Sequence, residues 1–148
     1  MLPDGDGWVR CDARHEHWGR FGAAGLLLRS EGQVLLQRRA WWTHHGRTWG
    51  VPGGARASWE SPEEAALREA VEEMRGADHL LGAVEVDRVH CDDHGGWAYW
   101  TVIADIATPF AVAARGAETA EMRWVTVADV TRLPLHPGFA ASWEAVAS

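Results

Sequence analysis

The sequence predicts an α/β fold in which helices pack on a central mixed β-sheet. Three observations support this class: short apolar segments of strand length recur along the chain, one clearly signalled helix lies near its middle, and helical segments close it. The 148 residues amount to about one domain, and no internal repeat or Pro/Ser-rich linker divides them. We therefore expect one domain over residues 1–148, with residues 1–20 as a polar N-terminal arm.

The expected elements follow from local residue patterns. Residues 23–28 and 33–37 are apolar runs typical of strands, and Ser30-Glu31-Gly32 is a turn sequence between them. Residues 41–60 are rich in Trp, Gly, Pro and His, which predicts a long loop. The remaining expected elements are a helix over 62–75, strands over 80–89 and 97–106 around a polar turn at 92–96, a strand over 121–127, and short helices over 127–133 and 137–146.

The helix over residues 62–75 has a strong start signal. Ser61 can accept hydrogen bonds from free backbone amides, and Pro62 suits the first helical position. Glu64 lies three residues after Ser61, which completes the pattern of a capping box. The helix is therefore expected to begin at Pro62.

Acidic residues gather on one face of this predicted helix. At about 100° per residue, one face carries the side chains expected to pack on the sheet, which are Leu67, Ala70, Val71 and Met74. The opposite face carries Glu69, Glu72 and Glu73 at i, i+3 and i+4 spacing. Like charges at this spacing destabilise a solvated helix slightly. The cluster is either a solvated acidic face balanced by Arg68 and Arg75 or a set of oxygen ligands for a hard divalent cation.

The charge composition limits the classes of partner. The net charge is −7, and all 14 basic residues are arginine, so we expect no broad nucleic-acid surface, no P-loop lysine and no Schiff-base lysine. The two cysteines are too few for a disulfide framework. The sequence has neither an apolar run of about 20 residues nor the pattern of a secretory signal. We expect a cytoplasmic protein that acts without a membrane.

A longer pattern surrounds the acidic residues: Gly54, five residues, Glu60, seven residues, then Arg68-Glu69-Ala70-Val71-Glu72-Glu73. It resembles the box of the Nudix (MutT-like) hydrolases, G-x5-E-x7-R-E-U-x-E-E-x-G-U, in which U is a bulky aliphatic residue. The resemblance covers Gly54 to Gly76, and the preceding Trp49–Gly53 is similar to the segment that leads into the box. Ala70, Arg75 and Gly76 depart from the pattern, and we expect Gly76 to cap the helix end in place of the family's glycine.

The resemblance implies an α/β/α sandwich around a mixed sheet, with the box as a loop–helix–loop. It also implies hydrolysis of a nucleoside diphosphate linked to another group, with Mg²⁺ or sometimes Mn²⁺ as the cofactor. The implied metal ligands are the carboxylates of Glu69 and Glu73, with Glu72 as a further ligand or proton acceptor, and the carbonyl of Gly54. Arg68 and Glu60 would form a pair that orients these carboxylates.

Candidate residues also lie outside the box. The general base is not always in the box in this family, so Glu118, with Glu121 as the weaker choice, is a candidate base; each is otherwise a solvated loop acid. The resemblance implies that Arg39 contacts substrate phosphate and that His136 contacts a base edge. His44 and His45 could meet the substrate, although loop histidines are more often polar surface.

Two short segments contain residue types that bind zinc, namely His90-Cys91-Asp92-Asp93-His94 and Cys11-x3-His15-x-His17. Each set is crowded and has no C-x-x-C partner, so the sequence favours polar loops over a zinc site in both. A structural zinc protein is thus the least favoured function.

We expect a metal-dependent pyrophosphohydrolase that cleaves a nucleoside triphosphate or another nucleoside diphosphate derivative. The alternative is a Nudix-fold sensor that binds a nucleotide without turnover, but a binder need not keep three mutually repelling carboxylates. Members that prefer ADP-ribose or dinucleoside polyphosphates carry a proline or a tyrosine soon after the box. Pro109 and Tyr99 lie too far along to favour either subtype. Edge strands of such sandwiches can pair, which is compatible with a homodimer.

Overall fold

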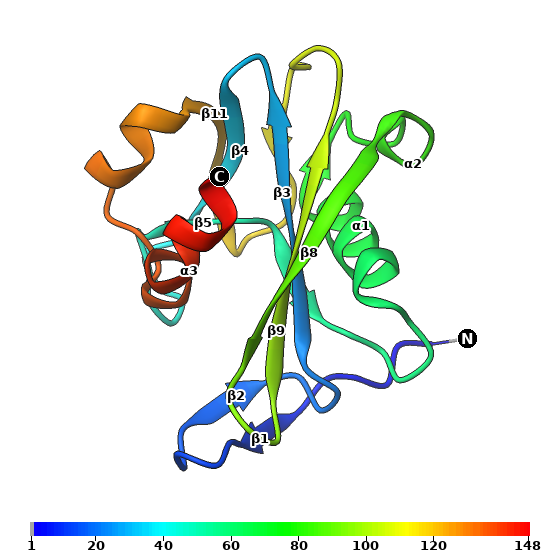
Figure 1. Cartoon of the computed structure of the whole chain (residues 1–148), viewed down its shortest axis with the longest axis vertical. Coiled ribbons are helices and arrows are strands. Elements are labelled where there is room, and N and C mark those ends of the chain that lie inside the picture. Colours follow the sequence, from blue (N-terminus) through cyan, green and yellow to red (C-terminus); the bar gives the residue numbers. More distant parts are fainter. Residues whose placement is uncertain (1) are drawn as a thin grey trace.

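The computed structural model describes residues 2–148 and is built on a mixed β-sheet (Figure 1). Among these residues the sheet has seven strands, and its main path runs β11 (Thr119–Thr126), β4 (Gln33–Arg39), β3 (Ala23–Ser30), β9 (Ala98–Asp105) and β8 (Glu85–Asp93). Two short strands extend it: β5 (Trp49–Gly50) pairs with β4, and β6 (Gly53–Ala55) pairs with β3. The β3–β9 pair is parallel, and the other pairings of this sheet are antiparallel.

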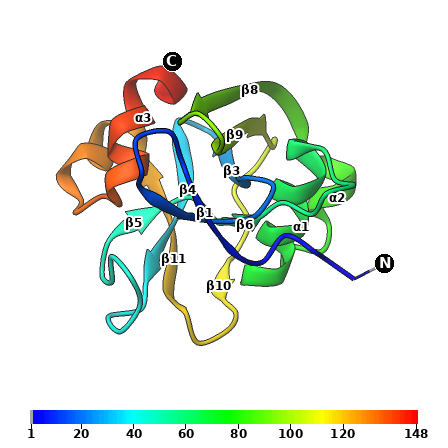
Figure 2. The same cartoon turned by 90° about the horizontal axis from the view of Figure 1, so that it is seen from below.

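Helices cover both faces of the sheet, which confirms the expected sandwich. Figure 1, and Figure 2 from below, show α1 (Pro62–Glu73) and α2 (Leu80–Ala83) on one side, and η1 (Val127–Arg132, orange) and α3 (Pro137–Ala147) on the other. Alternate residues of β3 serve the two cores: Leu26 and Leu28 belong to the cluster beneath α1, and Leu27 to the cluster beneath α3. This alternation follows from the two-residue repeat of a strand buried on both faces.

Two expectations about loops and strands are wrong in part, and the structure adds two small ladders that were not expected. The segment 41–60 is not all loop, because β5 and β6 pair with the sheet through their backbones. Glycine has a low strand propensity, so the sequence of this segment does not predict these strands. The segment 80–89 begins as the helix α2, and its strand starts only at Glu85, since a short apolar run fits either state. The arm contains a hairpin of β1 (Trp8–Arg10) and β2 (Glu16–Trp18), and a further small ladder joins β7 (Met74–Arg75) to β10 (Ala113–Ala114).

The capping box of α1 is confirmed. The Ser61 hydroxyl accepts a hydrogen bond from the Glu64 amide at 3.1 Å, and the Glu64 carboxylate accepts one from the Ser61 amide at 3.0 Å. The expected C-terminal cap is wrong: α1 ends at Glu73, and Met74 is already extended, with φ −124° and ψ 145°. Gly76 has φ +81° but lies beyond the short strand β7, so it turns the chain after the helix has ended.

The buried face of α1 is rotated from the one expected. The residues of α1 that pack fully are small: Ala65, Ala66 and Ala70, followed by Met74 just beyond the helix. Alanines let the helix approach the sheet closely. The expectation from the helical spacing of 100° per residue instead included the larger residues Leu67 and Val71 in the packed face. Glu69 and Glu73 therefore border the packed face instead of lying opposite it, and only Glu72 is exposed as expected. In the part of the chain that the structure describes, no helix is long and apolar enough to cross a membrane.

Candidate active site

The end of α1 packs its acidic residues against the glycines of β6. The Gly53 amide donates a hydrogen bond to Glu73 Oε2 at 3.1 Å. A Cβ on Gly54 would lie 2.5 Å from Glu69 Cδ, so the Glu69 carboxyl group is in direct contact with the backbone at this glycine. The β6 strand thus holds two carboxyl groups at positions where larger residues would displace them.

Both carboxyl groups are in an environment that disfavours negative charge. Burial, and then the neighbouring Glu69 carboxylate, raise the pKa of Glu73 to about 8. Burial also raises the pKa of Glu69, partly opposed by the Arg68 guanidinium. Two carboxylates in one poorly solvated place repel each other, and a cation bound between them would relieve that repulsion. This donor set of carboxylate oxygens suits a hard divalent cation such as Mg²⁺.

Arg68 connects the two halves of the Nudix-like pattern. Its Nε donates to Glu60 Oε2 at 2.6 Å, and its Nη2 donates to Glu60 Oε1 at 2.8 Å. Its Nη1 reaches Glu69 Oε1 at 3.0 Å and the more exposed Glu72 Oε1 at 3.3 Å. The geometry expected for the Arg68–Glu60 pair is therefore present, and Glu72 is turned toward Arg68 at the surface.

Arg39 lies at the end of β4, and its charge acts on two regions: the Glu73 carboxyl group and His136 at the start of α3. Its Nε donates to the His44 carbonyl at 2.8 Å. Its positive charge partly opposes the rise in the pKa of Glu73 that burial causes, and it adds to the lowering of the pKa of His136 that burial causes. Arg39 therefore lies near both the Glu73 carboxyl group and the start of α3.

His136 begins α3, where its Nδ1 accepts a hydrogen bond from the Gly138 amide at 3.1 Å. Burial, followed by the charges of His45, Arg39 and His44, lowers the pKa of His136 to about 4. The ring centroid of His45 lies 4.9 Å from that of His136. The loop that carries His44 and His45 therefore folds back over this helix start.

The two acids considered outside the box have different environments. Glu118 is exposed and directly precedes β11. Its backbone carbonyl accepts a hydrogen bond at 2.9 Å from the amide of Ala40, the residue that follows Arg39. Within residues 2–148 the structure records no hydrogen bond or ion pair of the Glu118 carboxylate. Glu121 is engaged, because it forms ion pairs with Arg38 at 3.5 Å and Arg123 at 2.7 Å. This difference favours Glu118 over Glu121.

Sequence reasoning placed Tyr99 in the strand over 97–106 but missed its position beside the carboxyl groups. The Tyr99 hydroxyl lies against both Gly25 and Gly53. A Cβ added to Gly53 would lie 2.9 Å from Tyr99 Oη, and a Cβ added to Gly25 would lie closer still. Burial raises the pKa of this hydroxyl, as do the nearby carboxylates of Glu73 and Glu69. The phenol stays protonated beside the carboxylates. A glycine in the apolar run 23–28 was the available signal of a close approach.

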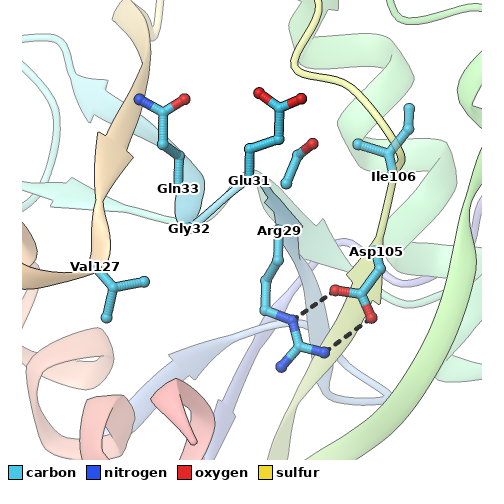
Figure 3. A pocket seen from close by; sticks show the side chains of 8 residues that line it. Arg29, Glu31, Gly32, Gln33, Asp105, Ile106 and Val127 are labelled. Carbon is cyan, nitrogen blue, oxygen red and sulfur yellow. Dashed lines mark hydrogen bonds and ion pairs between the residues drawn. The ribbon is translucent and has the colours of Figure 1, made fainter.

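A separate hollow of about 290 Å³ lies at the other end of β3 (Figure 3). Its wall includes Arg29, whose Nε and Nη2 hydrogen-bond Asp105 at 2.8 and 2.9 Å. Gly53 and Gly54 pair with the beginning of β3, at Gly25 and Ala24, whereas this hollow surrounds the turn after its end. It contains no residue of the Nudix-like pattern, and we do not assign it to catalysis.

The α/β/α sandwich and the two carboxyl groups of α1 beside the glycines of β6 are the arrangement that the resemblance to the Nudix hydrolases implies. The family model described as "NUDIX domain" matches residues 19–146. The chain belongs to the Nudix family and is a Nudix hydrolase.

Three comparisons support this assignment. The chain is 51% identical over 149 residues to a Mycobacterium tuberculosis (strain H37Rv) protein named "Putative 8-oxo-dGTP diphosphatase 3", covering 95% of this chain and 68% of that protein. It is 40% identical to a Bifidobacterium longum "Nucleoside triphosphate pyrophosphatase/Nudix hydrolase fusion protein", covering 94% of this chain and 30% of that protein. The crystal structure of the M. smegmatis Nudix hydrolase RenU has a TM-score of 0.82 and 47% identity, covering 95% of this chain and 92% of that one.

Proposed function

We propose that this chain is a divalent-cation-dependent pyrophosphohydrolase that cleaves a nucleoside triphosphate or a related nucleoside diphosphate derivative. The observation that carries the proposal is the pairing of the Glu69 and Glu73 carboxyl groups against Gly53 and Gly54. A purely structural role does not account for two repelling carboxyl groups in a place where burial already disfavours their charge.

The residues present fit a Mg²⁺ ion, or Mn²⁺ in its place, because both prefer oxygen ligands. Glu69 and Glu73 would hold the ion, with the Gly54 carbonyl and the more exposed Glu72 as additional oxygen donors. When bound, the cation neutralises charge on the phosphate oxygens and lowers the pKa of bound water.

The other site residues bind, orient or accept a proton. Arg39 would contact the substrate phosphates, because an arginine offers several donors to phosphate oxygens. Arg68 and Glu60 keep the Glu69 carboxylate in one orientation through the contacts described above. Glu118, exposed and beside the end of β4, would accept a proton from the attacking water, and Glu72 is the alternative acceptor.

The nucleoside part of the substrate is assigned to the region of His136. Its ring is neutral at physiological pH, since its pKa is lowered to about 4. Because Nδ1 accepts the hydrogen bond from Gly138, the Nε2–H group is left to donate to a base edge. The name of the M. tuberculosis relative makes 8-oxo-dGTP the first substrate to test.

The test is an assay of nucleoside monophosphate release over a panel of 8-oxo-dGTP, unmodified deoxynucleoside and ribonucleoside triphosphates, and nucleotide sugars, with Mg²⁺, Mn²⁺ or EDTA. We expect turnover that depends on the cation and falls by more than about 100-fold in Glu73→Gln, beyond the usual effect of an outer residue. Glu63→Gln is the matched control, because Glu63 is exposed in the first turn of the same helix. Turnover that persists in EDTA or in Glu73→Gln would overturn the cation assignment, and nucleotide binding without turnover would identify a sensor.

A further inference from the structure

The N-terminal hairpin packs against the turn between β8 and β9, at the lower end of the sheet in Figure 1. The Asp12 amide donates a hydrogen bond to the Gly95 carbonyl at 2.8 Å. A Cβ on Gly95 would lie 2.2 Å from Asp12 Oδ2, so the two segments are in close contact. Residues about 80 positions apart in the sequence are thereby brought together.

Three metal-binding residue types meet at this contact. Cys11 follows β1, His17 lies in β2, and His94 lies in the turn after β8. One ligand atom from each of these residues lies within 4.8 Å of the others. The cluster draws on both segments that carry zinc-type residues, and neither segment alone supplies the set.

The environment of the cluster includes a polar atom without a protein partner. Cys11 is only 5% exposed. The Nε2 atom of His17 is buried and has no hydrogen-bond partner among the described residues. Buried polar atoms are normally satisfied, so an orphan nitrogen beside a buried thiol calls for a ligand.

Each of the two histidine rings is held in place by a neighbouring side chain. His94 Nε2 lies 3.0 Å from Asp92 Oδ2, and a carboxylate in this position orients the ring and leaves the other nitrogen with a lone pair. The His17 ring stacks on Trp97 at 4.0 Å between centroids with an angle of 8°.

We propose that Cys11, His17 and His94 bind one Zn²⁺ ion that fastens the N-terminal hairpin to the β8–β9 turn. Sulfur and imidazole donors select zinc over Mg²⁺, so this site is chemically distinct from the carboxylates of α1. Binding forms a zinc–sulfur bond and releases the thiol proton of Cys11 to solvent. Water or a nearby carboxylate supplies the fourth ligand of the tetrahedron.

The test measures metal on the untagged chain of 148 residues. After removal of loosely bound ions and in excess Mg²⁺, elemental analysis should find one zinc per chain. Cobalt substituted for zinc should give a thiolate-to-cobalt charge-transfer absorption band. Cys11→Ser and His94→Asn should lose the metal and the band, whereas Cys91→Ser, at the exposed second cysteine, should keep both. Glu73→Gln should also keep its zinc, which separates this result from the outcome at the catalytic site.

Three results would overturn the zinc site. The first is that the folded wild-type chain takes up neither zinc nor cobalt. The second is a cobalt spectrum without the thiolate band, and the third is a loss of metal in Cys91→Ser as large as in Cys11→Ser. If Cys11→Ser does not fold, the cobalt spectrum of the wild-type chain and the His94→Asn variant decide the question. Added chelator should lower the melting temperature of the wild type and Cys91→Ser but not of His94→Asn.

Discussion

Arg68 and Glu60 form a two-point ion pair across eight residues of sequence, with N–O distances of 2.6 and 2.8 Å. The Glu60 side chain is only 8% exposed, and the hydrogen bond from Arg68 is the main reason that its pKa is lowered. The same guanidinium donates to the Ala55 carbonyl at 3.0 Å and to Glu69 at 3.0 Å. One planar group thus fixes the loop before α1 and one of the candidate ligand carboxylates together.

Replacement of Arg68 by lysine should therefore uncouple orientation from charge. An ammonium group keeps the positive charge but cannot form the two-point contact with Glu60 while also reaching Ala55. We expect kcat to fall by about 10- to 100-fold, the range typical of residues that orient metal ligands, while the chain still folds. Steady-state kinetics and thermal melts measure both effects. Arg75→Lys, at an exposed position after the helix, is the control and should leave kcat unchanged.

The contact between Gly54 and Glu69 predicts that Gly54→Ala impairs catalysis. The added Cβ would lie 2.5 Å from Glu69 Cδ, so the carboxylate must move out of place. We expect weaker Mg²⁺ activation, seen as a higher cation concentration for half-maximal turnover. Gly82→Ala is a suitable control, because a Cβ there has no neighbour within 4 Å. Equal Mg²⁺ dependence in the two variants would contradict the contact.

The buried ring of His136 should make the folded state sensitive to acid. Its pKa is lowered from 6.5 to about 4 on folding, so between these values the unfolded chain binds more protons than the folded one. Stability from this group is complete above pH 6.5 and is lost as the pH falls toward 4, by at most about 3 kcal/mol. Asparagine can cap α3 in its place without titrating. In urea unfolding across this range, His136→Asn should show a shallower pH slope than the wild type, and an identical slope would refute the assignment.

The Arg29–Asp105 pair in Figure 3 should contribute only modestly to stability. The hydrogen bond from Arg29 lowers the pKa of Asp105, but the Asp105 side chain is 48% exposed, so solvent screens the pair. We expect Asp105→Asn to cost about 1 kcal/mol or less near neutral pH, with no change in kcat. The difference should vanish once the pH falls below the lowered pKa, because the wild-type carboxyl is then neutral too. Asp78→Asn, at an exposed residue, is the control for urea unfolding.

Much of the site's framework could be predicted from sequence because it rests on local spacing. Ser61, Pro62 and Glu64 define where α1 begins through contacts within one turn, and the structure confirms them. The separation of Glu60 from Arg68 predicted their pairing, since it forms part of a family pattern. The catalytic roles of Glu69, Glu72, Glu73, Glu118, Arg39 and His136 stay predictions.

What the sequence could not predict depends on how the elements approach one another. The burial of Glu73 follows from three alanines that bring α1 close to the sheet, and a wheel cannot show which face is the packed one. The Tyr99 hydroxyl reaches the site only because β9 lies beside β3 in parallel register. The Cys11, His17 and His94 cluster likewise requires the hairpin and a distant turn to meet.

That parallel register between β3 and β9 also has a kinetic consequence. Arg29 pairs with Asp105, which is 76 residues further along the chain, and α1 lies in the segment that connects the two strands. Closing such a long loop costs conformational entropy before the contacts between the two strands can form. The two central strands should therefore associate late in folding. A chain in which β3 has paired with β4 but not yet with β9 would therefore lack the Tyr99 hydroxyl beside Gly25 and Gly53.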